Sequence, residues 1–332
     1  YPSFGKPHDG LGFAPELMRH SHGSTAIDGV LFYSDGLWPE EFRDNIFVGN
    51  VMTSRVNRDR LVYHGSSPEA VELDDFVKTE DPWFRPVDLQ LGPDGAFYIA
   101  DFYNRIIGHY EVPLNHPGRD RERGRLWRVV HQGQPAHPAA LPSDRDGLVA
   151  ELAPPSLPRR MLAMNAIEDR FGKAALPAVQ KALAAPANDW QSVHALWLAW
   201  GVGSDQFLSH LKATAASESR LLRVHAQRIA KADLEQMRAS AGQPSFTPAP
   251  PSTREGAVQR VAVDGLGGED ALERRCAAEA MGAWPLQPNV RRLLASLAEV
   301  PGDDTHLRYV VRKAVRGHLS AAPLFKALLA AN

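Results

Sequence analysis

Apolar and polar positions alternate most regularly within residues 82–110, and this pattern predicts a β-hairpin. In residues 87–91 (VDLQL) every second side chain is apolar, as on a strand with one buried face. The sequence PDG at 93–95 then indicates a tight turn, because Pro presets φ and Gly accepts positive φ. A second apolar run, 97–101 (FYIAD), follows at once, so strand, turn and strand are expected.

A second set of strands is expected ahead of this hairpin, at residues 29–33, 45–50 and 55–63, with a polar loop over 64–81. After the hairpin, either 106–112 or 125–130 supplies a further strand. Equivalent strands then recur at roughly 50–60 residues, near the upper end of about 50 residues for propeller-blade repeats, which suggests β-propeller blades. A propeller closes with about four to eight blades. Two blades therefore indicate part of a longer propeller, or one whose open side the rest of the chain covers.

The pattern changes to a helical one after a Pro-, Ala- and Asp-rich stretch, 135–158, which we interpret as a linker. Beyond it apolar residues recur at spacings of three and four. Helix pairs at roughly 30–45 residues indicate an α-solenoid of the HEAT or armadillo type. The expected domains are C-terminal propeller blades in 1–134, the linker, and a HEAT-like solenoid in 159–332. Expected helices are 159–171, 174–184, 189–200, 205–215, 220–230, 234–240, 254–264 (without a pairing partner), 271–283, 289–298, 307–319 and 323–331.

The composition argues against several classes of function. The 332 residues are 44% hydrophobic and 23% charged, with a net charge of -2, so nucleic acid is not an expected partner. The single cysteine, Cys276, excludes an internal disulfide and a CxxCH haem site, and its setting indicates a buried apolar residue. No apolar run is long enough to span a bilayer. The chain starts at Tyr1 without Met or a signal peptide, which indicates a piece of a longer polypeptide or a processed or engineered N-terminus.

The stretch from Trp83 to Val129, with its strand, GPDG turn and FYIADFYNR sequence, resembles a family of large bacterial proteins typical of planctomycetes and verrucomicrobia. These are labelled membrane-bound dehydrogenases. They combine a propeller, similar to soluble quinoprotein glucose and sorbosone dehydrogenases, with HEAT-like repeats and often a cytochrome c domain. The likeness covers residues 20–130 well and 150–332 only as a repeat pattern. It implies pyrroloquinoline quinone (PQQ) with calcium, a sugar or alcohol substrate, and a periplasmic or secreted location.

The same resemblance implies a small set of cofactor-binding residues. Arg85, just before the hairpin, matches an arginine that faces the quinone carboxylates. Ser24 and Thr25 match small polar residues ahead of a strand, Arg55 is the nearest counterpart of a basic residue, and His22 is expected in the pocket wall. The catalytic base and calcium ligands of the family lie in earlier blades, so no catalytic residue is assigned here. Electrons are expected to pass to a cytochrome domain outside this chain.

Simpler interpretations stand beside these. A structural ion pair of Arg85 with Asp88 or Asp81 is the alternative to cofactor binding. His20 and His22 could hold a metal, but no carboxylate or thiol partner is evident nearby, so no metal is expected. The polar residues Asp101, Asn104 and Arg105 suit either a loop site or an Asx turn. As a whole, the chain could instead be a non-catalytic scaffold whose propeller or solenoid binds proteins or glycans.

Overall fold

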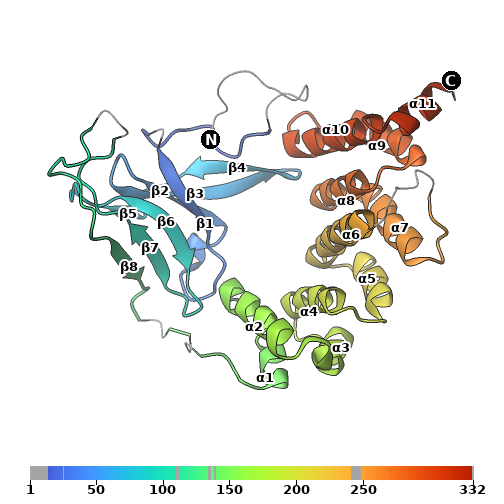
Figure 1. Cartoon of the computed structure of the whole chain (residues 1–332), viewed down its shortest axis with the longest axis horizontal. Helices are drawn as coiled ribbons and strands as arrows, with labels where there is room; N and C mark the ends of the chain where they lie inside the picture. The colour runs from blue at the N-terminus through green and yellow to red at the C-terminus, as the bar shows by residue number, and fades with distance from the viewer. Residues whose placement is uncertain are drawn as a thin grey trace. The chain divides into compact units, whose positions relative to one another are not determined.

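The computed structural model describes residues 14–24, 26–108, 112–133, 136–137, 140–240 and 248–330 (Figure 1). Antiparallel β-sheets come first in the chain and helices follow, as the sequence predicts. The chain divides into two compact units. We call them the sheet unit, Glu16–Val62 with Pro68–Asn165, and the helical unit, Tyr63–Ser67 with the chain from Ala166 onward. Each is described by itself.

The first sheet of the sheet unit is a meander in which sequence neighbours pair. Its order is β1-β2-β3-β4, and β5 pairs with the first two residues of β3. The strands span β1 Ile27–Phe32, β2 Asn45–Asn50, β3 Arg55–His64, β4 Ser67–Glu72 and β5 Val77–Lys78, with a 3-10 turn, η1, at Glu40–Phe42. Every residue of β2 is buried, so both faces of this sheet are covered.

The second sheet contains the predicted hairpin. Its order is β6-β7-β8, with β6 at Pro86–Leu91, β7 at Phe97–Asp101 and β8 at Arg125–Val129. Gly95 in the turn has φ 78°, the left-handed conformation for which glycine is suited. The third strand is therefore 125–129 and not 106–112. Of the latter, residues 106–108 form a loop, and residues 109–111, including His109, lie outside the described residues.

One apolar core joins the two sheets. Phe47 of β2 and Phe97 of β7 are fully buried, and their rings lie 5.0 Å apart at 74°. Phe76 packs on both rings. Burial of each such side chain stabilises the fold by about 1.5–3 kcal/mol. A smaller apolar cluster covers the other face of the first sheet and consists of Met18, Ile46, Val48 and Ala70.

The loop expected over 64–81 is wrong, because it contains β4 and β5. Gly65, with φ 61°, makes the turn between β3 and β4. Only the small residues Ser67 and Ala70 of β4 are buried. The two buried residues are small and three positions apart, so β4 shows neither a hydrophobic run nor a period of two, and the strand was not predicted.

Helices α1 and α2 begin within the sheet unit, and the rest form the helical unit. They span α1 Arg145–Ala150, α2 Leu157–Arg170, α3 Leu176–Ala184 (after a 3-10 turn, η2, at Gly172–Ala175), α4 Asp189–Gly201, α5 Phe207–Ala215, α6 Arg220–Ser240, α7 Arg254–Leu266, α8 Ala271–Ala283, α9 Gln287–Glu299, α10 Thr305–Leu319 and α11 Ala322–Ala330. Several begin at a polar side chain that accepts a main-chain N–H, as Asn188 does for α4 and Asp270 for α8.

Three helical expectations need correction. The stretch 135–158, expected as a linker, contains α1 and the start of α2, and Asp144 caps α1. The two helices expected at 220–230 and 234–240 are one continuous helix, α6. The helix expected to lack a partner, α7, packs against α6 and α8. Much of the loop expected after α6, residues 241–247, lies outside the described residues.

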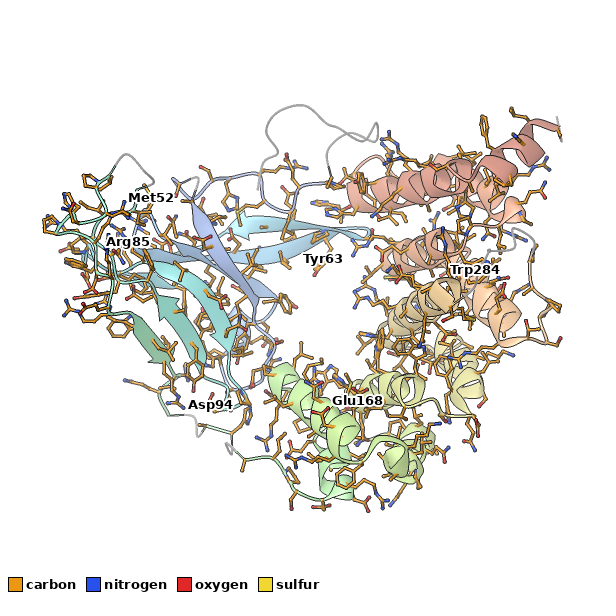
Figure 2. The ribbon with its side chains drawn as sticks, viewed as in Figure 1. Met52, Tyr63, Arg85, Asp94, Glu168 and Trp284 are labelled. Carbon is orange, nitrogen blue, oxygen red and sulfur yellow. The ribbon has the colours of Figure 1, made fainter. Side chains whose placement is uncertain are left out.

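The core of the helical unit is continuous from α4 to α10. Trp284, labelled in Figure 2, is 4% exposed. Trp197 and Trp200 are partly buried and pack against this core. Cys276 is buried there, as expected, and burial raises the pKa of its thiol. Within the described residues, no helix combines the length and the apolar character that a membrane crossing requires.

Candidate functional site

The loop before β1 lies along the outer face of the first sheet and brings two histidines to it. The carbonyl of Leu17 accepts the Ala70 amide of β4 at 2.7 Å, and the carbonyl of His22 accepts Asn50 Nδ2 at 3.2 Å. His22 has φ 50° and Gly23 has φ 68°. Histidine is among the side chains that tolerate this left-handed region better than most. A non-glycine residue held there by tertiary contacts is a reason to look for function.

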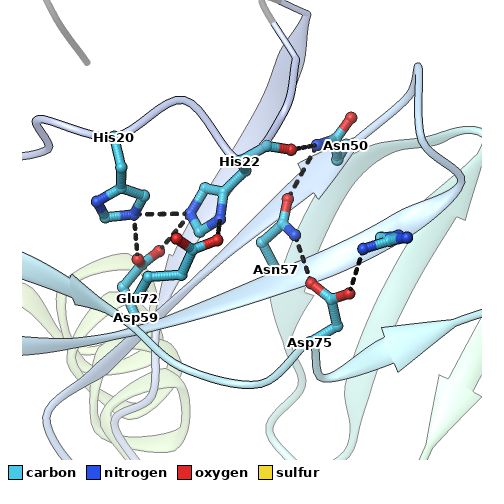
Figure 3. A network of polar contacts seen from close by, with 8 residues as sticks. His20, His22, Asn50, Asn57, Asp59, Glu72 and Asp75 are labelled. Carbon is cyan, nitrogen blue, oxygen red and sulfur yellow. Dashed lines mark hydrogen bonds and ion pairs between the residues drawn. The ribbon is translucent and has the colours of Figure 1, made fainter.

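Four side chains, which we call the imidazole–carboxylate cluster, meet at this loop: His20, His22, Asp59 and Glu72 (Figure 3). His20 Nε2 lies 2.6 Å from Asp59 Oδ1, and His22 Nε2 lies 2.9 Å from Asp59 Oδ2. The two Nε2 atoms are 3.1 Å apart. On the other side of its ring, His22 Nδ1 lies 3.0 Å from Glu72 Oε1.

Strand periodicity places Asp59 in this cluster. Side chains on a strand point alternately to opposite faces. Val56 of β3 enters the core between the sheets, so Asn57 and Asp59 face the opposite way, toward the histidine loop. The Asp59 side chain is 0% exposed and that of His22 1%, whereas Glu72, at the end of β4, is 55% exposed. Asp59 and His22 thus form the buried part of the cluster, and Glu72 lies at its solvent-exposed edge.

The electrostatics of His22 follow from these neighbours. Burial alone would lower the pKa of His22. The hydrogen bond and negative charge of Asp59, with those of Glu72, outweigh burial and raise this pKa above its ordinary 6.5. The imidazole therefore holds a proton more firmly than a free histidine when only protons compete for its nitrogens.

Two of the sequence-predicted residues, His22 and Arg55, belong to one hydrogen-bonded network (Figure 3). Asn50 Nδ2, which binds the His22 carbonyl, also donates to Asn57 Oδ1 at 3.1 Å. Asn57 Nδ2 donates to Asp75 Oδ1 at 2.6 Å. The network ends where Arg55 Nη1 binds Asp75 Oδ2 at 2.9 Å. The Arg55 side chain is 39% exposed, so its remaining donors can reach an anion in solvent.

Arg85, the third predicted residue and one of those labelled in Figure 2, is buried and binds two loops. Its Nε donates to the Asn104 carbonyl and Nη2 to the Arg105 carbonyl, each at 2.8 Å. Nη1 donates to the Val51 carbonyl at 2.7 Å and to Ser54 Oγ at 3.0 Å. Four of the five guanidinium N–H groups are thus used by the protein. Two-point recognition of a quinone carboxylate would have to displace at least one of these bonds, so Arg85 does not fit as a direct ligand in this conformation.

Ser24 and the polar residues after β7 stabilise turns. Ser24 Oγ accepts the Ala26 amide at 3.1 Å, and Thr25 lies outside the described residues. Asp101 Oδ1 accepts the Tyr103 amide at 3.0 Å, which is an Asx turn, and also the Arg85 amide at 2.8 Å. Asn104 Oδ1 accepts the Asp120 amide at 2.9 Å. The Asx-turn alternative for Asp101 is therefore the observed one.

Asp59 and Glu72 are the residues that sequence reasoning missed. They lie 39 and 50 positions from their histidine partners, so no local motif joins them. One signal was present, because Asn57 and Asp59 occupy the same face of an alternating strand where apolar residues would be usual. Buried polar residues at such positions require partners. Chemically, the cluster offers imidazole nitrogens and carboxylate oxygens, the groups that transfer protons or bind metal ions.

The comparisons with known proteins concern the same region. A family model described as a domain of unknown function, DUF7133, matches residues 10–133. The match includes both sheets, the imidazole–carboxylate cluster and Arg85. No curated protein matches the chain.

Proposed function

We propose that the sheet unit supplies the C-terminal blades of a β-propeller, and that the chain is part of a quinoprotein-like sugar or alcohol dehydrogenase of the periplasm or cell exterior. Each of its sheets is an antiparallel meander, which is the form of a propeller blade. The resemblance of residues 83–129 to the quinoprotein-like family supplies the enzymatic part of the proposal. Electrons would leave through a cytochrome domain on another part of the protein.

The observation that carries the blade interpretation is the close approach of the two sheets at glycines. A Cβ on Gly29 of β1 would lie 2.7 Å from Asp88 Cα of β6. A Cβ on Gly49 of β2 would collide with the Pro86 carbonyl oxygen at the start of β6. The leading strands of the two sheets therefore approach more closely than side chains would allow, as expected where neighbouring blades converge toward a propeller axis.

The predicted residues take different parts in such a pocket. Arg55, which is partly exposed, remains the candidate for contact with an anionic cofactor or the substrate. His22 is buried against Asp59 and Glu72 and is linked to Arg55 only through the Asn50–Asn57–Asp75 network. Arg85 holds the loops after β2 and β7 together and so acts on the pocket through its walls. When bound, the quinone would accept a hydride from the substrate.

The helical unit fits an α-solenoid of the HEAT type, with a surface suited to a protein partner. Helices α4, α6, α8 and α10 pack on one another in succession. Helices α3, α5, α7 and α9 each pack beside a member of that row. Two stacked rows of helices are the arrangement of α-solenoids.

Titration of the intact protein, with the earlier blades that the resemblance implies, tests the dehydrogenase proposal. PQQ is added in the presence of calcium and binding is followed by quenching of tryptophan fluorescence. Saturable binding is expected. Arg55→Ala should weaken it by about tenfold, equivalent to about 1.4 kcal/mol. Arg60→Ala, an exposed arginine on the same strand, is the matched control and should bind as the wild type does. Absence of saturable binding, or equal affinities in all three proteins, would contradict the proposal.

A non-catalytic scaffold is the second candidate, and one observation favours it. The arginine expected to face the quinone directs four of its donors to the protein itself. A folded chain that binds no PQQ would favour this candidate, in which the propeller and solenoid surfaces bind proteins or glycans.

A further inference from the structure

We propose that His20, His22 and Asp59 bind a divalent transition-metal ion of the zinc type, with Glu72 orienting His22 from outside. This site was not expected from the sequence, because its carboxylates come from distant strands. It stands independently of the proposed dehydrogenase function, since neither Arg55 nor a quinone takes part in it.

The distances between the donor atoms match those around a single ion. Atoms bound to one Zn²⁺ at about 2.0–2.1 Å lie roughly 2.9–3.4 Å from each other in octahedral or tetrahedral geometry. The two Nε2 atoms are 3.1 Å apart, and His22 Nε2 lies 2.9 Å from Asp59 Oδ2. The shortest distance, 2.6 Å from His20 Nε2 to Asp59 Oδ1, requires only a small adjustment of an imidazole that is 24% exposed.

Protons on the two Nε2 atoms cannot satisfy all three contacts among His20, His22 and Asp59. Each Nε2 carries at most one proton. If both are protonated, two N–H donors lie 3.1 Å apart with no acceptor between them. If one is not, its lone pair faces the negative Asp59 carboxylate at 2.9 Å or less. With the ring protons on Nδ1 and both Nε2 atoms deprotonated, a metal ion bound by the three side chains would replace all three contacts.

Asp59 gives a second, independent reason. Its side chain is 0% exposed, and both of its oxygens point at the imidazole nitrogens. Buried carboxylates are normally paired with a cation or bound to a metal. A metal ion bound by Asp59 and the two imidazoles would supply the positive charge that such a buried carboxylate requires.

Glu72 completes the arrangement from the far side of His22. Its Oε1 lies 3.0 Å from His22 Nδ1, which leaves Nε2 free of that contact and directed toward the ion. A carboxylate on the distal nitrogen of a metal-binding histidine orients the ring and raises its basicity. The candidate ligand atoms of His20, His22 and Glu72 all lie within 4.8 Å of one another, so Glu72 borders the site while acting on it through His22.

The donor set also selects the class of metal. Imidazole nitrogens suit zinc and its transition-metal neighbours, whereas calcium prefers six to eight oxygens. Three protein ligands leave coordination positions for water or another small ligand, as in catalytic zinc sites. The exposed edge formed by His20 and Glu72 gives the ion a route from solvent.

Isothermal titration of the metal-free full chain with Zn²⁺, in the presence of excess Ca²⁺, tests the site. Co²⁺ absorption in the visible range serves as a second readout that reports nitrogen and oxygen coordination. We expect one tight site per chain that calcium does not displace. His20→Ala and Asp59→Asn should each weaken Zn²⁺ binding at least tenfold, and Glu72→Gln by about tenfold.

The controls are His64→Ala, an exposed histidine on the same strand as Asp59, and Glu80→Gln, an exposed carboxylate. Both should bind Zn²⁺ as the wild type does. Because Asp59 is buried, its variant is interpreted only if its circular dichroism matches the wild type. The partly exposed His20 provides the alternative variant that leaves the core intact. Equal Zn²⁺ affinity of wild type and His20→Ala, or full displacement by Ca²⁺, would show an ion-pair cluster only and overturn the proposal.

Discussion

The Arg85 guanidinium and the Val51 carbonyl oxygen are joined by a hydrogen bond of 2.7 Å, which ties the start of β6 to the loop after β2. The same side chain binds the carbonyls of Asn104 and Arg105 in the loop after β7. Three main-chain carbonyls from two loops therefore depend on one buried cation.

Replacing Arg85 should mainly reduce stability. Arg85→Ala leaves several buried carbonyls without donors, and hydrogen bonds to charged groups contribute about 1.5–3 kcal/mol each. We expect a loss of about 3 kcal/mol or more in the free energy of unfolding, measured with urea, and a smaller loss for Arg85→Lys. Arg60→Ala should stay within about 0.5 kcal/mol of wild type. An Arg85→Ala protein as stable as wild type would show that these hydrogen bonds contribute little to stability.

The glycine at 49 should not tolerate a side chain. A Cβ there would meet the carbonyl oxygens of both Pro86 and Asp28, and a backbone atom cannot move aside as a flexible side chain can. Gly49→Ala should cost about 1–3 kcal/mol, the usual range for overpacking. The matched change is Gly124→Ala, where the nearest atom would be 3.5 Å away. Thermal unfolding of both variants checks the expectation, which is wrong if they melt together.

Asp94 should make the sheet unit sensitive to acid. Burial alone would raise its pKa, but hydrogen bonds from Arg128, the Ala96 amide and Tyr98 outweigh burial and hold this pKa below its ordinary 3.8. A carboxyl whose pKa is lowered by folding contributes stability above its unfolded pKa and loses it as the pH falls through its folded pKa.

The loss should therefore begin near pH 4 and grow as the pH falls further. Unfolding free energies at pH 5 and pH 3 should differ less in Asp94→Asn than in wild type. Arg128→Gln should reduce the difference in part, because it removes the two hydrogen bonds that the guanidinium donates to Asp94. An unchanged pH dependence in both variants would exclude this role.

In the helical unit, replacing Asp233 should lower the free energy of unfolding far more than replacing Glu235, two positions further along α6. Asp233 is 1% exposed and accepts Trp200 Nε1 at 2.8 Å and Arg254 Nη2 at 2.5 Å. Breaking a buried charged pair costs about 3–5 kcal/mol, and the partly exposed Arg254 should place Asp233→Ala near the lower end. Glu235→Ala removes only a surface pair with Lys231 and should cost about 0.5 kcal/mol or less. Urea unfolding distinguishes the two, and similar losses would contradict the assignment.

The sequence predicts well those elements whose conformation depends on residues close together in the chain. The β6–β7 hairpin follows from alternation and a PDG turn within 16 residues, and both strands lie where the sequence placed them. By contrast, the break expected in α6 does not occur. Asp233 lies in the gap expected between 230 and 234, and its side chain binds Trp200 and Arg254 from other helices. The continuity of α6 thus depends on contacts between helices, and the residues that make these contacts are far apart in the sequence.

The candidate site was only half predictable for the same reason. His20 and His22 attract attention as a spaced pair in the sequence. Their partner Asp59 depends on how β3 aligns beneath the loop, and Glu72 depends on β4, a strand with little hydrophobic signal. The resemblance led to Arg85 and Arg55, and the structure adds what each contacts.

X-ray absorption at the zinc edge, on the full chain loaded with one equivalent of Zn²⁺, tests the metal site most directly. The account predicts two imidazole nitrogens at about 2.0–2.1 Å with one or more oxygens, and one imidazole fewer in His20→Ala. A spectrum with oxygen neighbours alone, unchanged by His20→Ala, would contradict it.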